Sequence, residues 1–232
     1  MKVVILAGGF GTRLSEYTDT IPKPMVPIGG KPIIEHIMNI YSKFGHNDFY
    51  IALGYKGEVI KDYFKNFKNK DWKINLIDTG SDTLTGGRLK RMEKYFFNEN
   101  FLLTYGDGIS NIDINALIKF HDSHNKMVTI SAVRPPARFG SLSLDGSDVL
   151  KFKEKKQLGE SWINGGFFVM NTKFLSFLDG DKTVLEKEPL EKITDLKELK
   201  AFKHEGFWQC MDHKLDKDYL DQLINEKKAP WI

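Results

Sequence analysis

Short apolar runs alternate with stretches of helical apolar spacing over the first 135 residues of the chain. Apolar runs without regular polar positions are typical of strands buried on both faces of a sheet. We predict strands at 2–7, 48–55, 72–78, 101–105 and 127–133, and helices at 33–44, 59–67, 88–96 and 113–124. Asp113 is the expected N-cap of the last of these helices. Strands that alternate with helices predict an α/β fold with a mostly parallel, Rossmann-like central sheet flanked by helices.

The pattern changes near residue 140. Apolar and polar residues alternate around Asp145-Gly146, which predicts a hairpin and hence a small antiparallel β appendage. A further strand is expected at 161–171, a short helix at 172–178, a strand near 199–208 and a last helix at about 214–227. That helix should carry five apolar residues on one face: Leu215, Tyr219, Leu220, Leu223 and Ile224. No linker or repeat interrupts the chain, so we expect one domain, 1–232, with halves at 1–135 and 136–232.

Charge and composition narrow the classes of protein. The formal net charge is +3, and no arginine-rich stripe or aromatic–basic repeat is present, which disfavours nucleic-acid binding but suits small anionic substrates. Cys210 is the one cysteine in the sequence, so no internal disulfide is expected. The chain starts with a predicted strand and has no long apolar run, so we expect no signal peptide, no membrane span and a cytoplasmic location.

Glycines follow the first predicted strand. Gly8, Gly9 and Gly11 let backbone N–H groups approach an anion without a Cβ in the way, and Thr12 and Arg13 come next. The pattern is neither a P-loop nor the full dinucleotide fingerprint, because the Gly-Lys-Ser/Thr and the third glycine are missing. A plain strand-to-helix turn with a solvated arginine is the alternative.

A lysine on a stiff backbone follows this loop. Lys23 lies between Pro22 and Pro24, which fix φ on both sides of it. A phosphate cradle, an arginine and a rigidly mounted lysine together predict a polyphosphate substrate.

These segments resemble a known family. The string LAGGFGTRL…PKPMVPIGGKPIIEH resembles the signature of sugar-1-phosphate nucleotidylyltransferases. Later stretches are similar to the glucose-1-phosphate cytidylyltransferase branch: DTGSDTLTGGRLKR, TYGDG, RFG, WINGGFFVMN and FWQCMD. The resemblance implies the nucleotide-diphospho-sugar transferase fold. It also implies a Mg²⁺-dependent enzyme that joins CTP to a phosphorylated acceptor, such as glucose 1-phosphate, by direct in-line attack with release of pyrophosphate.

The resemblance also implies site residues. Arg13 and Lys23 would be catalytic. The nucleotide would be bound by Leu6, Ala7, Gly8, Gly9, Gly11, Thr12, Arg13, Lys23, Thr79, Gly80, Thr85, Gly86 and Asp107.

Two aspartates far apart in the sequence are the expected Mg²⁺ ligands. Asp107 follows a buried strand, where ligands bind in open α/β sheets, and Asp212 follows FWQCM. The resemblance places a Mg²⁺-binding aspartate at each position, and Mg²⁺ prefers carboxylate and phosphate oxygens. The alternatives are a turn residue for Asp107 and a helix N-cap for Asp212.

The acceptor would be held by Arg88, Glu154, Lys155, Asn164 and Gly165. Arg88 resembles the acceptor-phosphate arginine of the family, and an exposed helix cation is the alternative. Glu154-Lys155 is similar to a Glu-Lys-Pro motif, although Lys156 stands where proline is expected, and a charged strand end competes with this interpretation. Glycine in the strand 161–171 suggests close approach of a ligand, or a β-bulge.

Four other residues are weaker candidates for the site. His121 and His124 have a spacing that could bind zinc, but no third ligand is nearby, so we expect solvated helix histidines. Cys210 is expected to be a small buried residue rather than a nucleophile. Trp208 would pack over the acceptor or in the core.

Several alternatives stay open. The chain is shorter between Phe64 and Asp78 than the cytidylyltransferases it resembles, so phosphoglutamine for capsule phosphoramidate synthesis, a heptose phosphate or another nucleotide are alternative substrates. A non-catalytic subunit that only binds nucleotides is a further alternative. Such a protein would be expected to lack Lys23, Asp107 or Asp212, and all three residues are present. We also expect a homo-oligomer and a role in bacterial surface polysaccharide synthesis.

Overall fold

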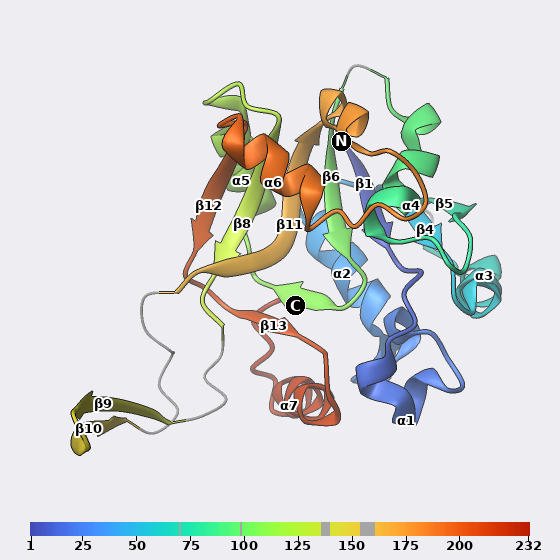
Figure 1. Cartoon of the computed structure of the whole chain (residues 1–232). Coiled ribbons are helices and arrows are strands. Elements are labelled where there is room, and N and C mark those ends of the chain that lie inside the picture. Colours follow the sequence, from blue (N-terminus) through green and yellow to red (C-terminus); the bar gives the residue numbers. More distant parts are fainter. Residues whose placement is uncertain (70, 98, 136–139, 154–160) are drawn as a thin grey trace.

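Seven strands form the central sheet of the computed structural model, in the order β12-β8-β11-β6-β1-β4-β5 (Figure 1). The structure describes residues 1–69, 71–97, 99–135, 140–153 and 161–232. The strands are β1 (Lys2–Leu6), β4 (Asp48–Leu53), β5 (Lys73–Asp78), β6 (Asn100–Tyr105), β8 (Val128–Val133), β11 (Ile163–Asn171) and β12 (Leu199–His204). β11 runs antiparallel to its neighbours β6 and β8, and the other pairs in this sheet are parallel. The predicted α/β class and mostly parallel sheet are confirmed.

The register between β1 and β6 fixes the positions of the two loops that follow these strands. Val3 to Leu6 are buried, and alternate residues enter apolar clusters on opposite faces of the sheet. Leu6 lies opposite Tyr105 in the parallel ladder. The glycine loop after β1 and the Gly106–Gly108 segment after β6 therefore leave the sheet side by side at the same edge.

Helices cover both faces of the sheet, as predicted. The first apolar cluster includes residues of α2 (Ile33–Ser42), α3 (Gly57–Lys65), α5 (Ile114–Asp122) and α7 (Lys214–Asn225). The second includes residues of α4 (Thr85–Arg91), α6 (Glu188–Asp195) and the 3-10 helix η4 (Thr172–Phe177), and Tyr95 of η3 (Glu93–Tyr95) packs against it. Asp113 caps α5 by accepting a bond of 2.9 Å from the Ala116 N–H, as expected.

Short elements complete the edge where the site lies. The 3-10 helix η1 (Thr12–Leu14), helix α1 (Ser15–Thr18) and the 3-10 helix η2 (Lys23–Met25) precede a small hairpin of β2 (Pro27–Ile28) and β3 (Lys31–Pro32). β7 (Gly108–Ser110) pairs antiparallel with β13 (Trp208–Cys210). This three-residue pairing, which the sequence pattern does not predict, joins the ends of the two segments that carry Asp107 and Asp212.

Three predicted elements differ in detail. The helix expected at 88–96 begins at Thr85 and ends at Arg91, followed by η3. The strand near 199–208 is two separate strands, β12 and β13. The apolar residues of α7 do not share one environment: Leu220 is buried, whereas Leu215 is 81% exposed and Tyr219 is 44% exposed. Among the helices of the described residues, none is long and apolar enough to cross a membrane.

The predicted hairpin around Asp145-Gly146 is present as β9 (Ser141–Asp145) and β10 (Asp148–Lys153), and it projects away from the sheet (Figure 1). Five apolar side chains on it are more than half exposed: Leu142, Leu144, Val149, Leu150 and Phe152. A two-stranded hairpin alone in water is marginally stable at best.

Candidate active site

A cavity of about 580 Å³ opens at the edge of the sheet where β1 and β6 end. Its walls come from the loop after β1, the segment before α4, the Tyr105–Gly108 segment, the start of β11 and the end of β13. Carboxyl ends of parallel strands are the usual binding edge of an open α/β sheet. Segments from both halves of the sequence therefore meet in one cavity.

The glycine loop has a conformation that side chains would disturb. Gly11 has a φ of +65°, and a Cβ there would lie 2.9 Å from the Thr18 Cγ2 atom. A Cβ on Gly8 would overlap the guanidinium of Arg88. A Cβ on Gly9 would meet nothing within 4 Å, so this glycine borders the open cavity. Leu6 and Ala7 also line the cavity, whereas Thr12 begins η1 and is exposed.

Lys23 is buried in the wall of the cavity and paired with two carboxylates. Its side chain is 9% exposed, and its Nζ donates to Asp107 Oδ2 at 2.7 Å and to Asp212 Oδ1 at 2.8 Å. Burial by itself would lower the pKa of Lys23, but the carboxylates outweigh it and the pKa is raised. The ammonium group is therefore fixed in place and charged.

Arg13 joins the same group of charges. Its side chain is 65% exposed, and its Nη1 donates to Asp212 Oδ2 at 2.8 Å. The alternative of a solvated surface arginine agrees with this exposure, but the guanidinium is paired with Asp212, and its catalytic role stays a prediction. Burial would raise the pKa of Asp212, but Lys23 and Arg13 hold that pKa below its ordinary value.

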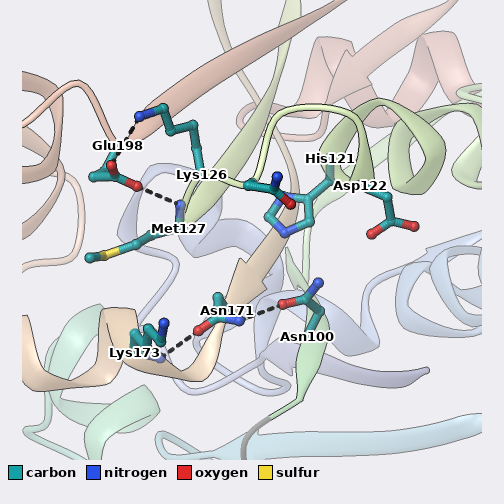
Figure 2. Close-up of a pocket in the computed structure, with 9 residues that line it drawn as sticks. Asn100, His121, Asp122, Lys126, Met127, Asn171, Lys173 and Glu198 are labelled. Atoms are coloured by element: carbon teal, nitrogen blue, oxygen red, sulfur yellow. Dashed lines mark hydrogen bonds and ion pairs between the residues drawn. The ribbon is translucent and has the colours of Figure 1, made fainter.

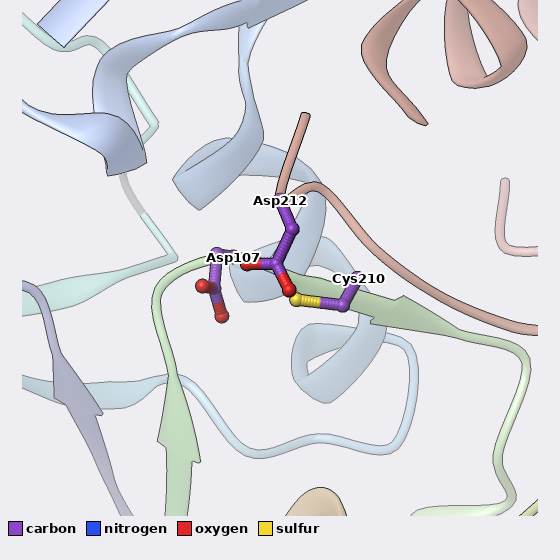
Figure 3. A group of neighbouring side chains, drawn as sticks. All are labelled: Asp107, Cys210 and Asp212. Atoms are coloured by element: carbon purple, nitrogen blue, oxygen red, sulfur yellow. The ribbon is translucent and has the colours of Figure 1, made fainter. Parts of the chain in front are cut away.

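Asp107, Cys210 and Asp212 converge in Figure 3, with ligand atoms that all lie within 4.8 Å of one another. The Met211 N–H donates to the Asp107 carbonyl at 2.9 Å, which ties the two segments together next to β7 and β13. The N-cap alternative for Asp212 is wrong, because His213 is the N-cap of α7. The Asp216 carboxylate accepts hydrogen bonds from the backbone N–H groups of Asp212 and His213, at 2.9 Å each. The Asp212 carboxylate is therefore not the cap of this helix.

The chemistry of this group suits a hard divalent cation. Two carboxylates supply the oxygen ligands that Mg²⁺ prefers, and substrate phosphates usually supply others. Cys210 is partly exposed, and burial of its sulfur raises the pKa of the thiol. A protonated thiol is a poor ligand for an oxygen-preferring ion, so Asp107 and Asp212 are the pair that fits.

Arg88 is buried at the centre of a hydrogen-bond network. The alternative of an exposed helix cation is therefore wrong. The residue is 4% exposed. Its guanidinium donates to five acceptors at 2.7–3.2 Å: the carbonyls of Gly8, Leu53, Gly80 and Ser81 and the hydroxyl of Thr79. Arg88 thus holds the turn after β5 against the glycine loop. Its role as an acceptor-phosphate ligand stays a prediction.

We expect Arg88→Met to unfold at a lower temperature than the wild type. The change leaves several buried carbonyls without a donor, which costs about 3 kcal/mol or more. That corresponds to roughly 6–12 °C in Tm for a chain of this size. Differential scanning calorimetry measures the shift. Arg91→Met is the matched control, since Arg91 lies on the same helix and pairs with Asp181 at the surface. Equal shifts for the two variants would contradict the account of Arg88.

The expected base-binding residues differ in their environments. Thr79 is fully buried and donates to the Leu53 carbonyl at 2.6 Å. Gly80 has a φ of +83°, and Gly86 is packed against Thr183. Of the four expected residues, Thr85 lines the cavity, together with four residues that sequence reasoning missed: Ser81, Asp82, Thr83 and Leu84. Their segment follows β5, and its position next to the glycine loop depends on Arg88.

The acceptor side is formed in part by the start of β11. Asn164 and Gly165 line the cavity, and the ladder with β8 shifts register between Asn164 and Phe168, in agreement with a bulge. Close approach of a ligand to these residues stays a prediction. Asn164 Oδ1 accepts from the Gly166 N–H at 2.8 Å. Trp208 lines the cavity and donates from Nε1 to the Gly165 carbonyl at 2.7 Å. Glu154 and Lys155 lie outside the described residues.

His121 and His124 belong to a different part of the molecule. Each ring shares a hydrogen bond of 2.9 Å with the Thr129 hydroxyl. His121 is 3% exposed, and burial lowers the pKa of both histidines, so the expectation of solvated histidines is wrong for His121. His121 lines a second cavity of about 520 Å³, at the edge of the sheet where β8 begins (Figure 2).

The chain is similar to known proteins over nearly its whole length. A family model described as "Nucleotidyl transferase" matches residues 2–214. A protein of Salmonella typhi named glucose-1-phosphate cytidylyltransferase is 48% identical over 253 aligned residues, which cover 100% of this chain and 98% of the relative. The "probable glucose-1-phosphate cytidylyltransferase" of Bacillus subtilis is 39% identical, with coverage of 100% and 99%. The crystal structure of HddC from Yersinia pseudotuberculosis has a TM-score of 0.77 at 29% identity, with coverage of 96% and 99%.

Proposed function

The chain belongs to the nucleotidyl transferase family, and from that membership we propose that it joins CTP to a sugar 1-phosphate, giving a CDP-sugar and pyrophosphate. The relatives named glucose-1-phosphate cytidylyltransferase, which align over the whole chain, favour glucose 1-phosphate as the acceptor. The observation that carries the proposal is the group of Arg13, Lys23, Asp107 and Asp212 at the mouth of one cavity.

This group suits the transfer because both reactants are anions. An oxygen of the acceptor phosphate attacks the α-phosphorus of CTP, a new P–O bond forms, and the bond to the bridging oxygen breaks. Pyrophosphate leaves with that electron pair. The main barriers are charge repulsion and alignment, so positioned positive charge is what the protein must supply. Lys23 and Arg13 would turn from the aspartates to phosphate oxygens, and N–H groups of the Gly8–Gly11 loop would contact the triphosphate.

Asp107 and Asp212 would hold Mg²⁺. When bound, that ion neutralises phosphate charge and orients the triphosphate. Its two protein ligands come one from each half of the sequence. The division into a nucleotide-binding half at 1–135 and an acceptor-binding half at 136–232 stays a prediction. Cys210 would take no part as a nucleophile, because its thiol stays protonated.

We also propose residues for the base pocket and for the acceptor site. Thr79, Gly80, Thr85 and Gly86 would shape the base pocket, together with the segment 81–84. Arg88, Glu154, Lys155, Asn164 and Gly165 would hold the acceptor.

A pyrophosphate-release assay tests the proposed function. CTP, UTP, dTTP and GTP are each combined with Mg²⁺ and with glucose 1-phosphate, mannose 1-phosphate, a heptose phosphate or phosphoglutamine. The expected result is the highest kcat/KM for CTP with glucose 1-phosphate. A higher value with phosphoglutamine or with another triphosphate would overturn the acceptor or the base assignment. No turnover with any pair would favour a nucleotide-binding subunit.

Acceptors other than glucose 1-phosphate stay in the test because this chain is shorter than its Salmonella relative. The alignment with the Salmonella relative spans 253 positions against 232 residues in this chain, so the relative has residues that this chain lacks. A shorter loop could change the acceptor pocket, which is why the panel includes acceptors other than glucose 1-phosphate. The cytoplasmic location and the role in surface polysaccharide synthesis stay predictions.

Self-association through the β9–β10 hairpin is a further part of the proposal, with a second copy of this chain as the partner. Five apolar side chains on the hairpin are 54–68% exposed, and a two-stranded hairpin alone in water is marginally stable, so contact with a second copy would remove apolar surface from water and stabilise it.

We expect the double variant Leu150→Asp/Phe152→Asp to have a lower mass than the wild type in size-exclusion chromatography with light scattering. The physical reason is that two charges replace the apolar side chains that a second copy would cover. Lys151→Ala, on the same strand, is the control. A wild-type mass equal to that of one chain would contradict the prediction.

A further inference from the structure

Glu186 is an acidic residue in the cavity that the proposed phosphate transfer does not use. Glu186 is exposed to the cavity, between η4 and α6. Its Oε1 accepts from the Tyr105 hydroxyl at 2.5 Å, and its Oε2 accepts from the Thr85 hydroxyl at 2.7 Å. No family motif in the sequence marks this position.

The backbone around Glu186 is fixed against α4. The Leu84 N–H donates to the Asp181 carbonyl at 2.8 Å, and the Gly86 N–H donates to the Thr183 carbonyl at 3.0 Å. Leu185 is fully buried, and its N–H donates to the Thr85 hydroxyl at 2.9 Å. The carboxylate therefore faces the cavity from a rigid support, as a recognition group requires.

The charge of Glu186 indicates what it would recognise. A carboxylate repels phosphate, and it accepts hydrogen bonds without donating any. Among the residues that the structure describes, each of its oxygens accepts one hydrogen bond, which leaves a lone pair on each for a ligand donor. The donors on the proposed substrates are the hydroxyls of the two sugars and the amino group of cytosine.

The neighbours of Glu186 favour the acceptor sugar. Tyr105 ends β6, two residues before Asp107, and its hydroxyl accepts from Asn164 Nδ2 at 3.4 Å. Asn164 is the second residue of β11, which lies next to β6, on the far side of it from β1 and the glycine loop. The row Asn164–Tyr105–Glu186 thus lines the acceptor side of the cavity with hydrogen-bonding groups.

We propose that Glu186 determines acceptor specificity by accepting hydrogen bonds from hydroxyl groups of the sugar 1-phosphate, with Tyr105 as its positioning partner. This inference rests on the proposed function, because it names how the same site selects its acceptor. A non-sugar acceptor without adjacent hydroxyls would remove water from the carboxylate without donating to its remaining lone pairs, which is unfavourable in a closed site.

The test measures the two substrates separately in Glu186→Gln. The amide keeps the shape of the side chain but loses the charge and one acceptor. The expected result is a rise of roughly tenfold to a hundredfold in KM for glucose 1-phosphate, with KM for CTP unchanged. Deoxy analogues of glucose 1-phosphate provide the second arm. The analogue lacking the contacted hydroxyl should bind wild type weakly, and Glu186→Gln should discriminate little against it.

Two further variants keep the test decisive. Glu188→Gln is the control, since Glu188 lies two residues further on, outside the cavity, and pairs with Lys192. Tyr105→Phe removes one hydroxyl while keeping the ring, and we expect it to raise KM for the acceptor in the same direction, which tests the inference even if Glu186→Gln fails to fold.

The outcomes separate the inference from the proposed function. A rise in KM for CTP alone would place the carboxylate on cytosine or ribose and overturn the inference, as would no change in either KM. Absence of wild-type turnover with CTP and any sugar 1-phosphate would instead contradict the proposed function.

Discussion

Lys23→Ala lowers kcat by about a hundredfold to a thousandfold, with the fold retained. Removal of one positioned group that stabilises transition-state charge typically costs ~2.7–4 kcal/mol. Lys23 fits that description, because its Nζ is buried, charged and within 2.8 Å of both proposed metal ligands. Steady-state kinetics with saturating CTP and acceptor measures the loss. The decrease should appear in kcat more than in either KM, since the alanine removes a contact made most strongly in the transition state.

The control for this variant is Lys31→Ala. Lys31 is eight residues further along, 59% exposed and paired with Glu35 away from the cavity. Circular dichroism and Tm show whether each variant is folded. A folded Lys23→Ala protein with a kcat close to that of the wild type would refute the role of this lysine.

Asp107→Asn and Asp212→Asn each lower activity by about a hundredfold or more, and each raises the Mg²⁺ concentration at which activity is half-maximal. An amide is a weaker ligand than a carboxylate for a hard cation, and the proposed site has only these two protein ligands. Activity at increasing Mg²⁺, with CTP saturating, measures both effects. Asp212→Asn should have the larger effect, because its carboxylate also pairs with both Lys23 and Arg13.

Asp113→Asn is the matched control for the aspartate variants. Asp113 caps α5, and asparagine is an equally good N-cap, so this variant should keep its Tm and its Mg²⁺ dependence. If either site variant kept wild-type activity over the whole Mg²⁺ range, the assignment of that aspartate would be wrong.

The sequence predicts the parts of the site that depend on local signals. The apolar run before Gly8 is β1, and the prolines around Lys23 place it in a short 3-10 helix. Asp113 could be identified as a cap, because capping needs only the residue type and the start of a helical pattern.

Other parts depend on pairings between distant segments. β7 and β13 are three residues each, too short for a pattern, and their pairing brings Asp107 and Asp212 together. Arg88 looks like a surface cation in TGGRLKR. However, Gly86 and Gly87 let the segment 181–183 pack directly on that helix, and the arginine turns inward. The packing of the segment 181–183 on α4 also makes Ser81–Thr85 and Glu186 face the cavity.

Whether the four charged residues act on a metal-bound triphosphate is the central claim. Crystals grown with Mn²⁺ in place of Mg²⁺ and with a non-hydrolysable CTP analogue test it through the anomalous signal of manganese. The account predicts a manganese peak bound by Asp107 and Asp212, with Lys23 and Arg13 within about 3 Å of phosphate oxygens. A triphosphate bound elsewhere, with Lys23 still paired to both aspartates and no manganese beside them, would contradict the account.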